Sequence, residues 1–76
     1  MIRYELLAQR LDDSEYGSVL TYGVTVLDHG EIIRSVEDIS LDKEKVGALI
    51  TRFNQERLSP VHLDEAIENF LYDFEV

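Results

Sequence analysis

His62 and Glu65 are the two residues whose types and spacing suit chemistry best. They lie three positions apart in a segment with helical periodicity, so they would share one helical face, as two metal ligands or an acid–base pair do. A metal ion needs three or four ligands, and the only other histidine, His29, falls in a predicted hairpin tip. We therefore favour a structural role for His62 near the start of a helix, where a neutral ring can cap or pack. A small-molecule or metal site around His62 is the alternative function.

Two other polar residues are candidates for binding. Tyr22 precedes Gly23, and the pair could set a phenol beside an open backbone, but a core tyrosine next to a glycine that relieves crowding is the simpler interpretation. Asn54 falls late in the first predicted helix, where capping of the helix end is favoured over contact with a ligand or a backbone carbonyl. In the alternative function, Tyr22, Asn54 and Glu65 would converge on His62.

An acidic outer face is predicted for the last helix, formed by Asp64, Glu65, Glu68 and Asp73. Such a face is usually solvated, but it can also dock on another protein. The whole chain has 16 acidic and 7 basic residues and a net charge of −9. That charge repels phosphate backbones and anionic lipid headgroups, so no nucleic-acid or membrane partner is expected. A surface that imitates nucleic acid towards a basic protein is a third hypothesis.

Hydrophobic periodicity predicts the elements that position these residues. Alternation indicates strands over residues 2–10, 16–27 and 31–39, with the even positions of the first strand on one face and those of the second strand facing inward. A period of 3.6 then indicates an amphipathic helix over about residues 42–56 and a second helix whose apolar stripe runs from Leu63 to Phe74. Strands and helices do not alternate along the chain. The predicted fold is therefore α+β, a three-stranded antiparallel meander with both helices on one face.

The hairpin between the second and third strands can form in two ways. A two-residue loop, His29-Gly30, would place Asp28 opposite Glu31, which is an unfavourable pair of like charges. A three-residue loop with Gly30 left-handed avoids that pair, and we favour it. The register of the sheet stays open.

Helix boundaries are indicated by capping residues. Ser40 or Asp42 suits the start of the first helix, and Ser59 followed by Pro60 predicts the N-cap and first position of the second. Inside the first helix, Gly47 either allows a close approach to the sheet or is merely tolerated.

Composition limits the remaining possibilities. Seventy-six residues are expected to form a single domain, 1–76. Cysteine is absent from the sequence, so neither a disulfide nor a thiolate zinc site can brace the core. The sequence shows no secretory signal pattern and no long apolar run, so a cytoplasmic location is expected. No catalytic motif, cofactor loop or metal-ligand series is recognisable, and we predict neither enzymatic activity nor a cofactor.

Several segments resemble a known family. They are Thr21-Tyr22-Gly23-Val24, Asp38-Ile39-Ser40, Val46 and Leu49 in the first predicted helix, Asn54, Leu58-Ser59-Pro60-Val61-His62-Leu63 and Ile67-Glu68-Asn69-Phe70-Leu71. Together they are similar to a family of short, chiefly clostridial bacterial proteins that form a domain of unknown function. The Leu-Ser-Pro-x-His-Leu segment is the most specific part, whereas Asn69 stands where the family often has an acidic residue. The resemblance implies a bacterial origin and an intracellular setting, but it assigns no activity to any residue.

The leading hypothesis is a non-enzymatic interaction or regulatory module, working as a homo-oligomer or as an adaptor for another protein. It is motivated by the acidic helix face and by the uncovered face of a small sheet. With both helices on one face, the other would show the odd positions of the second strand: Val19, Thr21, Gly23, Thr25 and Leu27.

Overall fold

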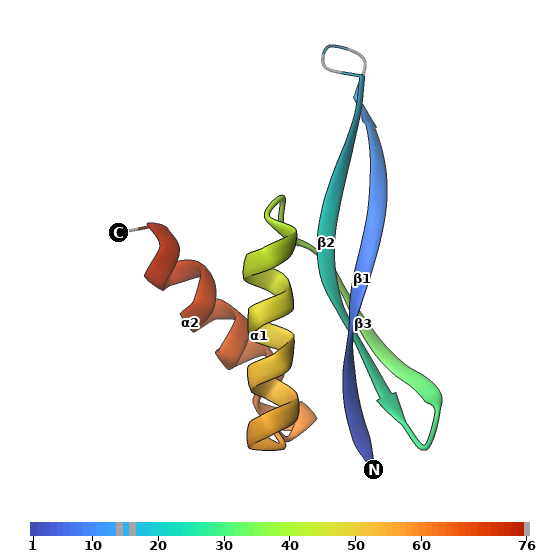
Figure 1. Cartoon of the computed structure of the whole chain (residues 1–76), viewed down its shortest axis with the longest axis vertical. Helices are drawn as coiled ribbons and strands as arrows, with labels where there is room; N and C mark the ends of the chain where they lie inside the picture. Colours follow the sequence, from blue (N-terminus) through green and yellow to red (C-terminus); the bar gives the residue numbers. More distant parts are fainter. Residues whose placement is uncertain (14, 16, 76) are drawn as a thin grey trace.

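The computed structural model describes residues 1–13, 15 and 17–75, with the side chains of these except Asp13 and residues 73–75. Three antiparallel strands in the order β1-β2-β3 are followed by two helices on one side of the sheet (Figure 1). This confirms the predicted α+β meander. The elements are β1 (Ile2–Asp13), β2 (Gly17–Asp28), β3 (Glu31–Ser40), α1 (Lys43–Glu56), the 3-10 turn η1 (Pro60–His62) and α2 (Leu63–Glu75). No helix in the described residues is long and apolar enough to cross a membrane.

The hydrophobic core lies between the sheet and α1. Even positions of β2 face inward, as predicted, and even positions of β1 lie on the same side of the sheet; Tyr4, Val24 and Val26 are buried. The apolar stripe of α1 packs with them, and α2 adds residues from its first two turns. The buried helical residues are Val46, Leu49, Ile50, Phe53, Leu63 and Ile67.

β1 and β2 extend beyond the rest of the domain. The last described pair between β2 and β3 joins Tyr22 to Ser40, whereas β1 and β2 stay paired out to Asp13 and Gly17. We call this two-stranded extension, residues 9–13 and 17–21, the arm; Figure 1 shows it rising past the N-terminal end of α1. Because the helices do not reach so far, Leu20 is exposed despite its predicted inward position. The predicted strand start at Tyr16 lies outside the described residues.

The β2–β3 hairpin has a two-residue loop, so the expected three-residue loop is wrong. His29 and Gly30 both have positive φ, 53° and 83°, which suits the twist of the flanking strands. Asp28 does lie opposite Glu31. Its charge is offset by the Met1 ammonium at 3.3 Å, and the His29 ring lies 2.7 Å from the same carboxylate oxygen. The hydrogen bond from the ammonium, which has the larger effect, and the one with the His29 ring hold the pKa of the Asp28 carboxyl below its usual range.

Gly23 is required where β3 bulges. β3 residues 37–39 lie opposite this single β2 residue, between the pairs Tyr22–Ser40 and Val24–Val36. Asp38 takes a left-handed φ of 53° there, and its carboxylate accepts a 2.5 Å hydrogen bond from the Thr21 hydroxyl. A Cβ on Gly23 would stand 2.1 Å from the Val36 carbonyl oxygen. The interpretation that Gly23 relieves crowding is confirmed.

Helix starts follow the prediction only in part. Asp42 is the N-cap of α1, and its carboxylate accepts from the Glu44 and Lys45 amides. Ser59 precedes Pro60 with N-cap backbone angles, but its side chain makes no cap bond. Its carbonyl instead accepts from the His62 amide at 2.9 Å. The second helical segment therefore opens with the turn η1, held by backbone atoms.

Candidate functional site

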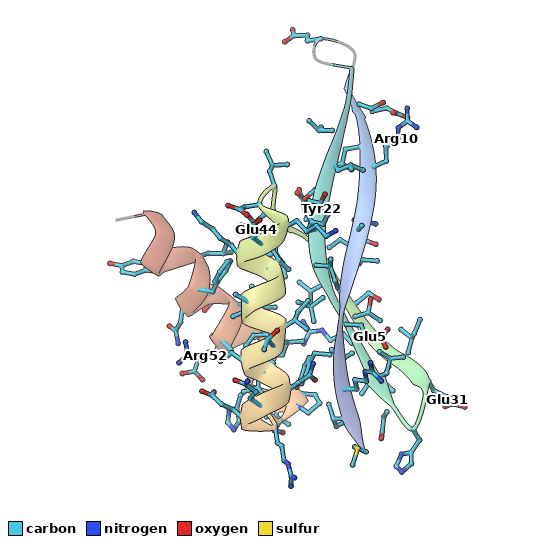
Figure 2. All side chains as sticks on the ribbon, in the orientation of Figure 1. Glu5, Arg10, Tyr22, Glu31, Glu44 and Arg52 are labelled. Atoms are coloured by element: carbon cyan, nitrogen blue, oxygen red, sulfur yellow. The ribbon has the colours of Figure 1, made fainter. Side chains whose placement is uncertain are left out.

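Tyr22 and Asn54 do not converge. Tyr22 is half-buried against the core, and Figure 2 shows it level with Glu44 near the start of α1. Asn54 is ten residues further along α1 than Glu44, which is about 15 Å of helix. Along β1, Tyr22 lies opposite Ala8 while Asn54 bonds to Tyr4, and these two β1 residues are about 13 Å apart. The arrangement gives no support to a common site for the two side chains.

Asn54 pairs with the edge of the sheet rather than with the end of its own helix. Its side-chain oxygen accepts from the Tyr4 amide and its side-chain nitrogen donates to the Tyr4 carbonyl, each at 2.9 Å. The amide group thus takes the place of a neighbouring strand at one residue of β1. The predicted capping role is wrong, because Arg57 closes α1 in a left-handed conformation with φ 52°.

The Tyr4 side chain completes this connection between β1 and the end of α1. Its hydroxyl donates a 2.5 Å hydrogen bond to the Leu58 carbonyl, and its ring meets Phe53 edge-on with centroids 5.3 Å apart. Burial raises the pKa of the Tyr4 hydroxyl, because the anion would lose solvent. Through these contacts, Tyr4 and Asn54 form a structural lock, meaning that they hold the C-terminal end of α1 against β1.

His62 and the acidic residues of α2 lie at the surface. The His62 side chain is exposed, so the predicted packing role does not hold, and its backbone amide provides its structural contribution. Asp64 accepts a hydrogen bond from Arg34 and so ties α2 to β3. Glu65 and Glu68 are exposed, while the side chain of Asp73 lies outside those described. Within the described part of the chain, no three His, Asp or Glu side chains are grouped closely enough to hold a metal ion.

A groove of about 550 Å³ separates α1 from α2. Figure 2 shows Arg52 on the side of α1 that faces α2, and its guanidinium bonds to Glu56 at 3.2 Å. Of the apolar residues in the groove, Leu49 and Phe53 are buried, and the others, Leu58, Ala66 and Phe70, are half-buried. The groove therefore offers a docking protein little uncovered apolar surface.

The face of the sheet away from the helices carries more exposed apolar surface. Residues opposite each other in a register share a face, and odd positions of β1 and β2 point away from the buried Val24 and Val26. Ile32 lies on this face because it is opposite Leu27. Arg34 is opposite Val26 and so points toward the helices, and its neighbour Ile33 therefore points to the other face, that of Ile32. We call the six aliphatic residues of this face the outer patch: Leu7, Leu11, Val19, Leu27, Ile32 and Ile33.

Exposure within the outer patch is highest on β3. Ile32 is 67% exposed and Ile33 51%, and Leu11 and Val19 are exposed on the arm. Thr21 and Thr25, the threonines of β2 that lie between these residues, are buried. Thr21 is buried because the bulge at Asp38 covers it. Sequence alternation located the β2 part of this face correctly. It missed Ile32 and Ile33, because only the bulge next to the hairpin brings both to the same side.

Comparison with known proteins gives a family but no function. A family model described as a family of unknown function, DUF6514, matches residues 1–73. The chain belongs to this family. Searches of curated proteins and of solved structures found no match. The DUF6514 chain can therefore be assigned a role only from its own surfaces.

Proposed function

We propose that this DUF6514 chain is a non-enzymatic protein-interaction module that binds another protein through the outer patch. The observation that supports the proposal is the exposure of adjacent Ile32 and Ile33 on an uncovered sheet face. Contiguous exposed aliphatic side chains are costly in water and typically mark a surface that another protein covers. Full burial of one isoleucine side chain contributes about 1.5–3 kcal/mol.

The charges around the outer patch suit a partner that is neutral or basic. Arg3 and Glu5 lie on the same face and pair with each other at 3.5 Å, so they leave the centre of the face without net charge. The chain as a whole carries −9. Long-range attraction would therefore favour a basic partner, while the aliphatic contact would supply most of the affinity.

The setting proposed for this interaction is the bacterial cytoplasm. It rests on the likeness of the Leu58–Leu63 segment to short bacterial proteins. The exposed Glu65 and Glu68 would then lie on the opposite side of the molecule from the bound partner, as part of a solvated helix face.

Affinity capture with three baits tests the proposal. One bait is the unaltered chain, one carries Ile32→Lys and Ile33→Lys, and the control carries Leu41→Lys and Val61→Lys. The control residues are 66% and 85% exposed and lie outside the outer patch. Each variant adds two lysines, so both variants change the charge equally. We expect a partner that the unaltered and control baits retain and that the outer-patch variant binds at least about tenfold more weakly. Equal retention by all three baits would contradict the proposal.

A further inference from the structure

We propose that the free edge of β1 pairs with the same edge of a second copy of this chain, so that two sheets join into one continuous sheet. This inference goes beyond the proposed function, because it concerns a second surface, the edge of β1, and a second copy of this chain as its partner. It rests on four features of β1: its regularity, the direction of its backbone groups, its length and the charges along it.

The two edges of the sheet differ in regularity. β1 pairs with β2 in one unbroken register from Ile2 to Asp13, and it contains no proline or lysine. β3, at the opposite edge, is interrupted by register shifts at two places, near Gly23 and near Val26. Bulges, proline and lysine are the usual means by which proteins prevent an edge strand from pairing with another chain. β3 is protected in this way, and β1 is not.

The contact with Asn54 shows which backbone groups of β1 point outward. Tyr4 offers both its amide and its carbonyl to Asn54, so even-numbered residues of β1 direct these groups away from β2. Leu6, Ala8, Arg10 and Asp12 therefore face outward too. Among the described residues, no backbone hydrogen bond outside the β1–β2 ladder is recorded for these four. All four residues are exposed, so a second strand can reach them.

Asn54 also fixes where the pairing must stop. With Tyr4 occupied, the free edge runs over residues 6–12, whose midpoint is Gln9. An antiparallel pair of two such edges, related by a two-fold axis at Gln9, uses the whole free segment. Ala8 then lies opposite Arg10 of the second copy and Leu6 opposite its Asp12, and each of these pairs exchanges two main-chain hydrogen bonds.

Side chains in this register are compatible. On the face away from the helices, Leu7 lies opposite Leu11 of the second copy, and Gln9 lies opposite Gln9, so no like charges are directly opposed within residues 6–12. Arg10 and Asp12 sum to zero, and they are held together within one chain by a 3.6 Å contact and by Ser18, which bonds to both. The net charge of the molecule therefore does not fall on the paired segment.

Pairing would also explain the composition of the arm. A two-stranded ribbon is marginal in water, yet this one extends past the helices with Leu11 and Val19 exposed on one face and Leu20 on the other. Joining two arms side by side gives four strands at the centre of the assembly. It also brings Leu7 of each outer patch beside Leu11 of the other, because the two-fold axis is perpendicular to the sheet and both patches then lie on one side of it.

A cysteine at the predicted symmetry axis tests the inference directly. Gln9 pairs with itself in a non-hydrogen-bonded position, where the Cα atoms are about 4.5 Å apart, within the range of a disulfide. Since the sequence has no cysteine, Gln9→Cys introduces a single thiol, and Gln55→Cys on the exposed surface of α1 is the matched control. In a glutathione redox buffer, we expect Gln9→Cys to form a covalent dimer and Gln55→Cys to remain monomeric.

Sedimentation across a concentration series provides the second measurement. We expect a species of twice the 8.8 kDa chain mass, and we expect Ala8→Pro to abolish it. The Ala8 amide points outward, so proline there removes a bond to the second copy and none to β2. Ala8→Val, which keeps the amide, is the control, and circular dichroism checks that both variants fold. A chain that stays at 8.8 kDa, a dimer that survives Ala8→Pro, or equal cross-linking of both cysteine variants would overturn the inference. None of these results would alter the loss of a partner in the outer-patch variant, so the inference and the proposed function fail separately.

Discussion

Replacing Asn54 by alanine measures the strength of the contact that ties α1 to the edge of the sheet. The change removes two hydrogen bonds to the Tyr4 backbone, each worth about 0.5–1.5 kcal/mol net, for a loss of about 1–3 kcal/mol. Alanine is the better helix former by about 0.6 kcal/mol, which offsets part of that loss. We therefore expect the free energy of unfolding to fall by roughly 0.5–2.5 kcal/mol.

Asn69→Ala is the matched control for this experiment. Asn69 is an exposed asparagine of α2, so the same substitution there should show only the gain in helix propensity, about 0.6 kcal/mol. Urea denaturation of both variants gives the two free energies, and the corresponding melting temperatures should differ by about 4–8 °C for each kcal/mol. If Asn54→Ala were no less stable than Asn69→Ala, the lock between Asn54 and Tyr4 would not contribute to the fold.

Three further predictions follow from the same geometry. Gly23→Ala should destabilise the chain by about 1–3 kcal/mol, because its Cβ would clash with the Val36 carbonyl. Gly47→Ala should stabilise the chain by about 1 kcal/mol, because its Cβ would meet open space and alanine favours the helix. Urea denaturation of the two variants shows whether the changes in stability have these opposite signs. The raised pKa of Tyr4 means that its contribution to stability is complete below pH 10 and is lost as pH rises through the folded-state pKa. Tyr4→Phe should therefore show a smaller loss of stability as the pH rises above 10. Self-association should strengthen with added salt, because each chain carries a net charge of −9 and salt screens the repulsion between copies. Sedimentation at several salt concentrations tests this. A weaker association at high salt would show that charge attraction drives the self-association.

Much of the fold was predictable because local periodicity and tertiary packing agree. Alternation in β1 and β2 and the 3.6 period of α1 identified the inward residues, among them Tyr4, Val24 and Phe53, which the structure buries. Gly23 was also assigned its correct role, since a glycine inside a strand commonly marks a close approach of backbone.

The errors arose where distant segments meet. The prediction for the hairpin loop was wrong because it considered the repulsion between Asp28 and Glu31 without the Met1 ammonium. The antiparallel pairing of β1 with β2 places Met1 beside Asp28, although the two residues are far apart in the sequence. Asn54 was misjudged because its partner, Tyr4, lies 50 positions away, and nothing in the local pattern shows that a helix amide pairs with a strand edge. Both cases concern polar atoms satisfied by tertiary contacts, which periodicity does not report.

The candidate sites divide in the same way. Predicted site residues on α2 and η1 were correctly placed on helical segments, but His62, Asp64, Glu65 and Glu68 are exposed, and no three His, Asp or Glu side chains of the described residues group closely enough to hold a metal ion. The outer patch was half predicted, since alternation gives the odd positions of β2 while the irregular start of β3 decides where Ile32 and Ile33 point. Bulges are set by packing across strands, so their effect on a surface appears only in three dimensions.

Site-specific photo-crosslinking tests the role of the outer patch most directly. A photoreactive amino acid placed at position 33 lies within the outer patch, and one at position 61 lies at a more exposed position outside it. In cells that produce the protein, we expect position 33 to yield one discrete adduct with another protein and position 61 to yield none in common with it. Adducts of the same pattern and strength at both positions, or none at position 33, would contradict the assignment of this face as a binding surface.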